Sequence, residues 1–86
     1  MRTLVRVTKE DIRTGNKLSM SSCPVAKALE RVYGKSNVLV RILFAELYNE
    51  GLGVYREVDL PRSATKFIFD FDKNKHVKPF NFYLKD

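Results

Sequence analysis

The sequence predicts a small α+β domain with a mostly antiparallel sheet and helices packed on one face of that sheet. Its 86 residues leave room for one hydrophobic core, so we expect residues 1–86 to form a single domain. Two kinds of apolar pattern occur along the chain. Alternating apolar residues predict strands, and apolar residues three and four positions apart predict helices. Their order is β-α-α-β-β-α-β, and each segment has one apolar face to bury, which favours this packing.

The first two predicted elements are a strand at residues 2–7 and a short helix that follows it. The strand is predicted because its residues alternate between two faces, with Arg2 and Arg6 on the outer one. Thr8 is the expected N-cap of the helix. Asp11 lies in the first turn, where the helix dipole favours a carboxylate, and Gly15 is expected to end the helix.

A second helix is predicted between Ser22 and Gly34. Ser22 is the expected N-cap, Pro24 suits the first turn, and Gly34 suits the end. Apolar residues at positions i, i+3, i+4 and i+7 form one stripe that we expect to be buried. These residues are Val25, Ala28, Leu29 and Val32.

Residues 37–48 are rich in Val, Leu, Ile and Phe, and both a helix and a strand are compatible with that composition. The β-branched residues Val38, Val40 and Ile42 favour one long strand. The glycines within residues 49–53 indicate a turn, so residues 54–60 are expected to return as the second strand of a hairpin.

The chain is predicted to end with a helix that begins at Pro61 and a strand over residues 76–84. Phe69 lies off the apolar stripe of this helix, and Pro79 suits the start of a strand or an edge because it has no N–H. The helix stripe is Ala64, Phe67, Ile68 and Phe71, and the inward strand face is Phe80, Phe82 and Leu84.

The net charge of +6 is concentrated in the N-terminal half of the chain. Residues 1–43 carry nine basic and three acidic residues, whereas residues 44–86 carry seven of each. A surface that contacts a polyanion would produce this asymmetry. A soluble basic protein without such a partner would show it as well.

Nucleic-acid binding is therefore one hypothesis. Basic and aromatic side chains on an open sheet face would offer charges for phosphates and rings for base stacking. The alternative is that the arginine stems cover apolar surface while their heads pair with carboxylates. The candidate residues are Arg2, Arg6, Lys9, Arg13, Arg41, Arg56, Tyr55 and Tyr83.

A protein partner is the other macromolecular hypothesis. The last strand would offer its free edge to another chain if it lies at the edge of the sheet, and Phe69 and Tyr55 are candidate contacts. The alternative is that Phe80 and Phe82 simply fill the core of a small protein.

Cys23 is the candidate reactive thiol, because it lies at the predicted N-terminus of a helix, where amide groups stabilise a thiolate. The alternative is a small buried side chain that packs at the helix start. As the sole cysteine it has no disulfide partner within the chain, and we expect a reducing cytoplasm.

No constellation of catalytic residues is recognisable, so we expect no enzymatic activity, no cofactor and no metal site. No apolar run is long enough to cross a membrane, and we expect no membrane partner.

Two groups of residues resemble small uncharacterised proteins of tailed bacteriophages and prophages, over about half of the chain. The N-terminal group is VRVTKEDI at residues 5–12, Gly15, and CPVAKAL at residues 23–29. The C-terminal group is Leu60-Pro61, Ala64, Phe67-Ile68, Phe71-Asp72 and VKPFNF at residues 77–82. The resemblance implies a phage origin and the cytoplasm of a bacterial host, and it implies no activity or site residue.

Together these observations predict a small non-enzymatic, phage-encoded accessory protein that binds a host or phage macromolecule, with a protein as the first expectation. The alternative is a basic nucleic-acid-binding protein that uses its positively charged N-terminal half.

Overall fold

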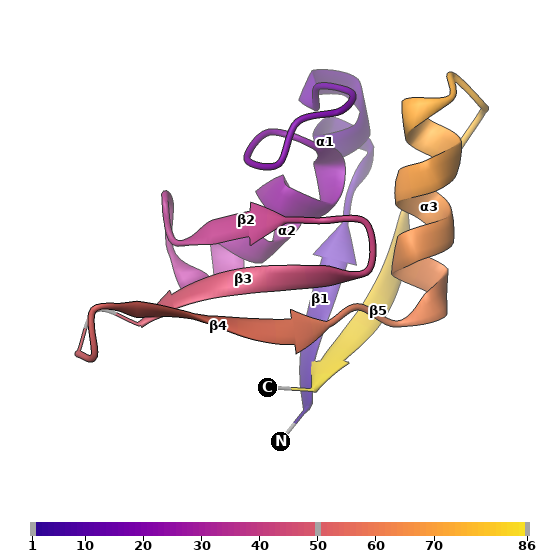
Figure 1. Cartoon of the computed structure of the whole chain (residues 1–86). Coiled ribbons are helices and arrows are strands. Elements are labelled where there is room, and N and C mark those ends of the chain that lie inside the picture. The colour runs from indigo at the N-terminus through magenta and orange to yellow at the C-terminus, as the bar shows by residue number, and fades with distance from the viewer. Residues whose placement is uncertain (1, 50, 86) are drawn as a thin grey trace.

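The computed structural model describes residues 2–49 and 51–85, and over these it confirms an α+β fold with antiparallel strands (Figure 1). Three helices and five strands are present in this described part. In chain order they are β1 (Arg2–Val7), α1 (Lys9–Thr14), α2 (Pro24–Tyr33), β2 (Val38–Val40), β3 (Phe44–Asn49), β4 (Val54–Asp59), α3 (Arg62–Asp72) and β5 (Phe80–Lys85).

The strands form two sheets rather than the single sheet expected. β1 pairs antiparallel with β5, so the first and last strands of the chain lie side by side, and β2, β3 and β4 form a separate meander (Figure 1). The physical reason lies in α2, which contacts both β1 and β2 and therefore packs against a strand of each sheet. Its buried face is wide enough to serve both, because neighbouring residues as well as spaced ones are buried. These are Pro24, Val25, Ala26, Ala28 and Leu29.

The prediction of one long strand over residues 37–48 is wrong, because a turn divides this segment into β2 and β3. The Arg41 N–H donates to the Phe44 carbonyl at 2.8 Å, which closes a hairpin with Ile42 and Leu43 at its tip. In β2 the even-numbered residues Val38 and Val40 are buried, whereas in β3 the buried residues Ala45 and Leu47 are odd-numbered. The alternation of buried and exposed residues therefore shifts by one position across the turn. The consecutive apolar residues at 42–44 conceal that change in the sequence. The element order is therefore β-α-α-β-β-β-α-β.

The predicted β3–β4 hairpin is confirmed, with its register running from Phe44 opposite Asp59 to Asn49 opposite Val54. The last strand begins at Phe80 rather than at residue 76. Pro79 directly precedes it and has no N–H to contribute to a ladder, which explains the late start.

The helix boundaries largely follow the predicted signals. Thr8 caps α1 in a full capping box with Asp11. α2 is capped by Cys23 rather than by the expected Ser22. The predicted burial of Val32 is wrong: this residue is exposed, and its neighbour Tyr33 packs against the core in that turn instead. On α3 the predicted stripe is buried and Phe69 is exposed.

Phenylalanine rings join α3 to β5 in the core. The ring centroids of Phe67 and Phe80 lie 4.8 Å apart, and those of Phe80 and Phe82 lie 5.7 Å apart. Phe82 is buried and Phe80 packs against the core, so these two rings act as core side chains rather than as surface contacts.

Candidate functional site

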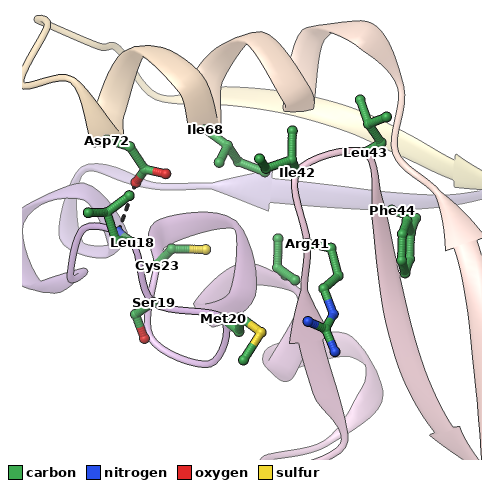
Figure 2. A pocket seen from close by; sticks show the side chains of 11 residues that line it. Leu18, Ser19, Met20, Cys23, Arg41, Ile42, Leu43, Phe44, Ile68 and Asp72 are labelled. Carbon is green, nitrogen blue, oxygen red and sulfur yellow. Dashed lines mark hydrogen bonds between the residues drawn. The ribbon is translucent and has the colours of Figure 1, made fainter.

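Three segments that are distant in the sequence surround an apolar groove (Figure 2). They are the loop before α2, the turn between β2 and β3, and the side of α3 that carries Ile68 and Asp72. The groove has a volume of about 490 Å³ and is partly open to solvent. Its rim is formed by Leu18, Ile42 and Leu43, whose exposed fractions are 82%, 71% and 67%. We call this site the apolar groove.

The two hairpin residues Ile42 and Leu43 occupy positions where large apolar side chains are unusual. Turn residues are most often Gly, Pro, Asn, Asp or Ser, whereas these two are large and apolar, although neither has a positive φ. Neither side chain gains burial in return, since each is at least two-thirds exposed. Folding of the hairpin does not explain this choice of residues.

Leu18 reaches the rim through an unfavourable backbone conformation. Its φ of +56° lies in the left-handed region, which costs a residue with a β-carbon about 1 kcal/mol. The Leu18 N–H donates to a carboxylate oxygen of Asp72 at 3.0 Å, which ties this loop to the end of α3 (Figure 2). The loop is also held to β2, because the Val40 N–H donates to the Met20 carbonyl at 2.8 Å.

Cys23, drawn in Figure 2, is buried and lines the groove, as Ile68 and Val40 also do. Its Sγ accepts a hydrogen bond from the Ala26 N–H at 3.4 Å, so the thiol caps α2. Burial raises the pKa of this thiol, and the amide hydrogen bonds of Ala26 and Val25 only partly oppose that effect. The direction is opposite to the one that a reactive thiol requires, and the geometry favours the packing role.

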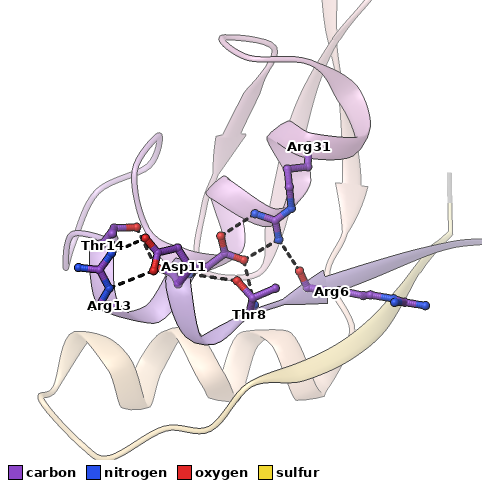
Figure 3. Close-up of polar contacts among 7 residues, drawn as sticks. Arg6, Thr8, Asp11, Arg13, Thr14 and Arg31 are labelled. Atoms are coloured by element: carbon purple, nitrogen blue, oxygen red, sulfur yellow. Dashed lines mark hydrogen bonds and ion pairs between the residues drawn. The ribbon is translucent and has the colours of Figure 1, made fainter.

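A separate polar cluster joins β1, α1 and α2 (Figure 3). Asp11 is only 2% exposed, and both of its carboxylate oxygens accept hydrogen bonds from Arg31 at 2.6 Å. The Thr8 N–H donates to Asp11 at 2.9 Å, and Arg31 also donates to the Arg6 carbonyl at 2.7 Å. Burial alone would raise the pKa of Asp11, but the hydrogen bonds from Arg31 and Thr8 outweigh it and the pKa is lowered. The carboxylate is fully engaged, so the cluster is a structural clamp. The sequence predicted that Asp11 lies in the first turn of α1, where the helix dipole favours a carboxylate. It did not predict the ion pair with Arg31, which is 20 residues away.

The candidate residues for nucleic-acid binding do not form one surface. Arg2 and Arg6 lie on β1, whereas Arg41 lies in the other sheet's turn and pairs with Glu46 at 3.0 Å. The remaining candidates lie elsewhere: Lys9 is exposed at the start of α1, Arg13 pairs with Glu10, and Tyr55 packs against Tyr48 with ring centroids 5.1 Å apart.

Phe69, the candidate protein contact, is half exposed on α3 and does not line the apolar groove. The Lys73 ammonium lies 4.3 Å from its ring centroid, which partly shields that ring. The sequence singled out neither Ile42 nor Leu43 as a surface residue, because both fell within the predicted strand.

Within residues 2–49 and 51–85, no three His, Cys, Asp or Glu side chains gather as a metal site would require. No helix in this part of the chain has the length and apolar character needed to cross a bilayer.

The chain matches no protein-family model, no curated protein and no solved structure.

Proposed function

We propose that this protein is a small non-enzymatic binding module that engages a protein partner through the apolar groove. The observation that carries this proposal is the meeting of Leu18, Ile42 and Leu43 around one groove, each of them at least two-thirds exposed. Exposed apolar residues are ordinary when they are scattered, whereas a contiguous group beside a groove is typical of an interaction site.

Energetic considerations support the same conclusion. Transfer of one large aliphatic side chain from water to an apolar contact contributes about 1.5–3 kcal/mol before the costs of association. Three such side chains therefore offer about 4.5–9 kcal/mol, which offsets much of the cost of association, and the rest must come from contacts with the other groove residues. Because none of the three is buried within the chain, that free energy remains available to a partner.

The partner segment that fits has apolar side chains in its centre. The charges beside the rim are mixed, since Lys17 is exposed next to Leu18, whereas Arg41 pairs with Glu46 and Asp72 lines the groove. The whole chain carries a net charge of +6. Two copies with this net charge repel each other, which favours an acidic partner over self-association.

The biological setting of this proposal is a phage-encoded accessory protein in the cytoplasm of a bacterial host, with a host or phage protein as the target. This setting rests on the resemblance of residues 5–29 and 60–82 to small proteins of tailed bacteriophages and prophages.

A displayed library of random 16-residue peptides tests the groove directly. We expect the selected peptides to carry apolar residues at helical or alternating spacing together with Asp or Glu, and to bind the purified protein at micromolar concentrations. Replacement of the turn tip by Ile42→Asn with Leu43→Gly removes both apolar side chains and introduces residues that turns accept readily. This variant is expected to fold and to bind the selected peptides at least about tenfold more weakly.

Leu52→Asn is the matched control, because Leu52 is 74% exposed at the tip of the other hairpin and does not line the groove. This control should bind as the wild type does. Equal binding by the turn variant, or a library that yields no peptide dependent on the groove, would refute the proposal.

A further inference from the structure

The outward face of the β1–β5 sheet is a second surface with its own chemistry. In the observed register Arg2 lies opposite Lys85, Leu4 opposite Tyr83, and Arg6 opposite Asn81. Because directly opposed residues of an antiparallel pair share a face, these six side chains project from the same side of the sheet. Three of them are cations, and none of these six positions holds a carboxylate. We call this surface the basic face.

Its cations are not neutralised within the described part of the chain. Ion pairs there engage Arg13, Arg31, Arg41, Lys66 and Lys75, whereas Arg2, Arg6 and Lys85 take part in none of them. Figure 3 shows the Arg6 side chain extending away from the Asp11 cluster, with only its backbone carbonyl bound by Arg31. Arg2 and Lys85 are directly opposed like charges, a pairing that destabilises a sheet unless an anion lies between them.

An aromatic ring lies at the centre of these cations. Tyr83 is 52% exposed, and the Arg2 guanidinium carbon lies 4.8 Å from the centroid of its ring. Arg2 covers part of the ring, as Lys73 does at Phe69, and the rest of the half-exposed tyrosine is accessible to a base. Proteins that bind single strands combine cations for the phosphates with aromatic rings for the bases, and this strand pair carries both.

The other sheet has the opposite charge on its outward side. Ala45, Leu47 and Val58 point inward from β3 and β4, so the residues between them point outward. The acidic outward residues are Glu46, Glu57 and Asp59. Glu57 and Asp59 line the same hollow as Tyr83 and Lys85. A polyanion is therefore expected to lie on the side of the basic face that carries Arg2 and Arg6, away from β4.

We propose that the basic face binds single-stranded nucleic acid, with Arg2, Arg6 and Lys85 on the phosphates and a base stacked on Tyr83. The site differs from the apolar groove and shares no residue with it. It combines residues from both ends of the chain, so it is not a property of the N-terminal half. Lys85 and Tyr83 belong to it, and Lys9, Arg13, Arg41 and Tyr55 do not.

The test is fluorescence anisotropy with a labelled 20-nucleotide oligo(dT), the same length of single-stranded RNA, and a duplex of equal length. We expect the two single strands to bind more tightly than the duplex and to lose affinity steeply between roughly 50 and 200 mM salt. The triple variant Arg2→Gln, Arg6→Gln, Lys85→Gln should bind at least about tenfold more weakly. Its slope of log affinity against log salt should fall by about 2, since each lost phosphate contact on a single strand contributes about 0.7.

The matched charge control is Lys9→Gln, Lys35→Gln, Lys78→Gln, which removes the same number of charges from residues elsewhere on the chain. This control should keep its affinity within about threefold. For the ring, Tyr83→Phe should retain binding and Tyr83→Leu should lose about tenfold, since only the former can stack on a base. The Tyr83 pair keeps the test informative even if the triple variant does not fold.

Any of four results would overturn this proposal. They are no binding of either single strand at about 50 mM salt, equal losses in the two triple variants, equal affinity of Tyr83→Phe and Tyr83→Leu, and tighter binding of the duplex. The turn variant Ile42→Asn with Leu43→Gly should bind oligo(dT) normally, so failure of the groove proposal and failure of this one are separable.

Discussion

At the scale of single residues, the buried Asp11 carboxylate links β1, α1 and α2 in the N-terminal half. It is buried, its two oxygens are bound by one guanidinium, and that guanidinium also holds the carbonyl of Arg6 in β1. Removal of Arg31 leaves a buried charge without its partner, which is more damaging than the loss of an exposed pair.

We expect Arg31→Met to lower the free energy of unfolding by about 2 kcal/mol, because Asp11 is buried while Arg31 itself is half exposed and solvent screens the pair. Urea denaturation followed by circular dichroism measures this. Arg13→Met removes the exposed partner of Glu10 and should have little effect. Equal losses in the two variants would show that the clamp does not contribute as described.

The same carboxylate makes stability depend on pH. The pKa of Asp11 is lowered on folding, so its contribution is present above the unfolded value of about 4 and is lost as pH falls through the lower folded value. The stability advantage of the wild type over Asp11→Asn should therefore shrink as the pH is lowered below about 4. An advantage that stays constant down to about pH 2 would contradict this assignment.

Cys23 provides a further test at this scale. Burial raises the pKa of the thiol, and the side chain caps α2 instead of facing free solvent. We expect iodoacetamide to alkylate Cys23 at about pH 7 at least about tenfold more slowly in the folded protein than in urea. Fast alkylation of the folded protein would instead support the reactive-thiol hypothesis.

At the scale of elements, the junction between α1 and α2 is sterically tight. Gly15 ends α1, and a β-carbon at this position would lie 2.7 Å from both the Asp11 carbonyl oxygen and the Cδ of Pro24. Backbone and a proline ring cannot move aside cheaply, so only glycine allows the two helices to approach this closely.

Gly15→Ala should therefore lower the free energy of unfolding by about 2–3 kcal/mol. Gly53→Ala is the control: that glycine has a φ of +68°, but a β-carbon added there would meet no atom within 4 Å, so only backbone strain of about 1 kcal/mol is expected. Chemical denaturation of both variants gives the comparison, and a smaller loss for Gly15→Ala would contradict the steric argument.

At the scale of the whole molecule, pairing of the first and last strands closes the fold. β5 supplies Leu84 and Phe82 to the core, so the end of the chain contributes to the same hydrophobic cluster as β1 and α2. A small domain has only about 5–15 kcal/mol of total stability, and it depends strongly on each large buried side chain.

Leu84→Ala should lower the free energy of unfolding by about 3 kcal/mol, because Leu84 is completely buried. Leu52→Ala, at an exposed hairpin tip, should change it by less than about 0.5 kcal/mol. Thermal and urea unfolding measure both. A loss below about 1 kcal/mol for Leu84→Ala would show that β5 is not an integral part of the core.

Much of the secondary structure followed from local pattern. Local sequence predicted the buried stripe of α3, because backbone geometry sets the spacing of buried residues on a helix. It also predicted the N-cap at Thr8, because free N–H groups at a helix start favour such side chains, and the hairpin between β3 and β4. The turn at Ile42 and Leu43 was not, since three consecutive apolar residues hide the change of phase between β2 and β3. The same error concealed the rim of the apolar groove.

Composition and local pattern were sufficient for the fold class, the excess of positive charge and most buried positions, since each depends on residue types or on neighbours a few residues away. The meeting of exposed side chains from distant segments followed only from the packing of the whole chain. Leu18, Ile42 and Ile68 line one groove, and Arg2 lies opposite Lys85, because two sheets pack around α2. Such contacts depend on how the helices and strands pack to bury all their apolar faces together. The local spacing of apolar residues predicts each face but not which faces pack against one another.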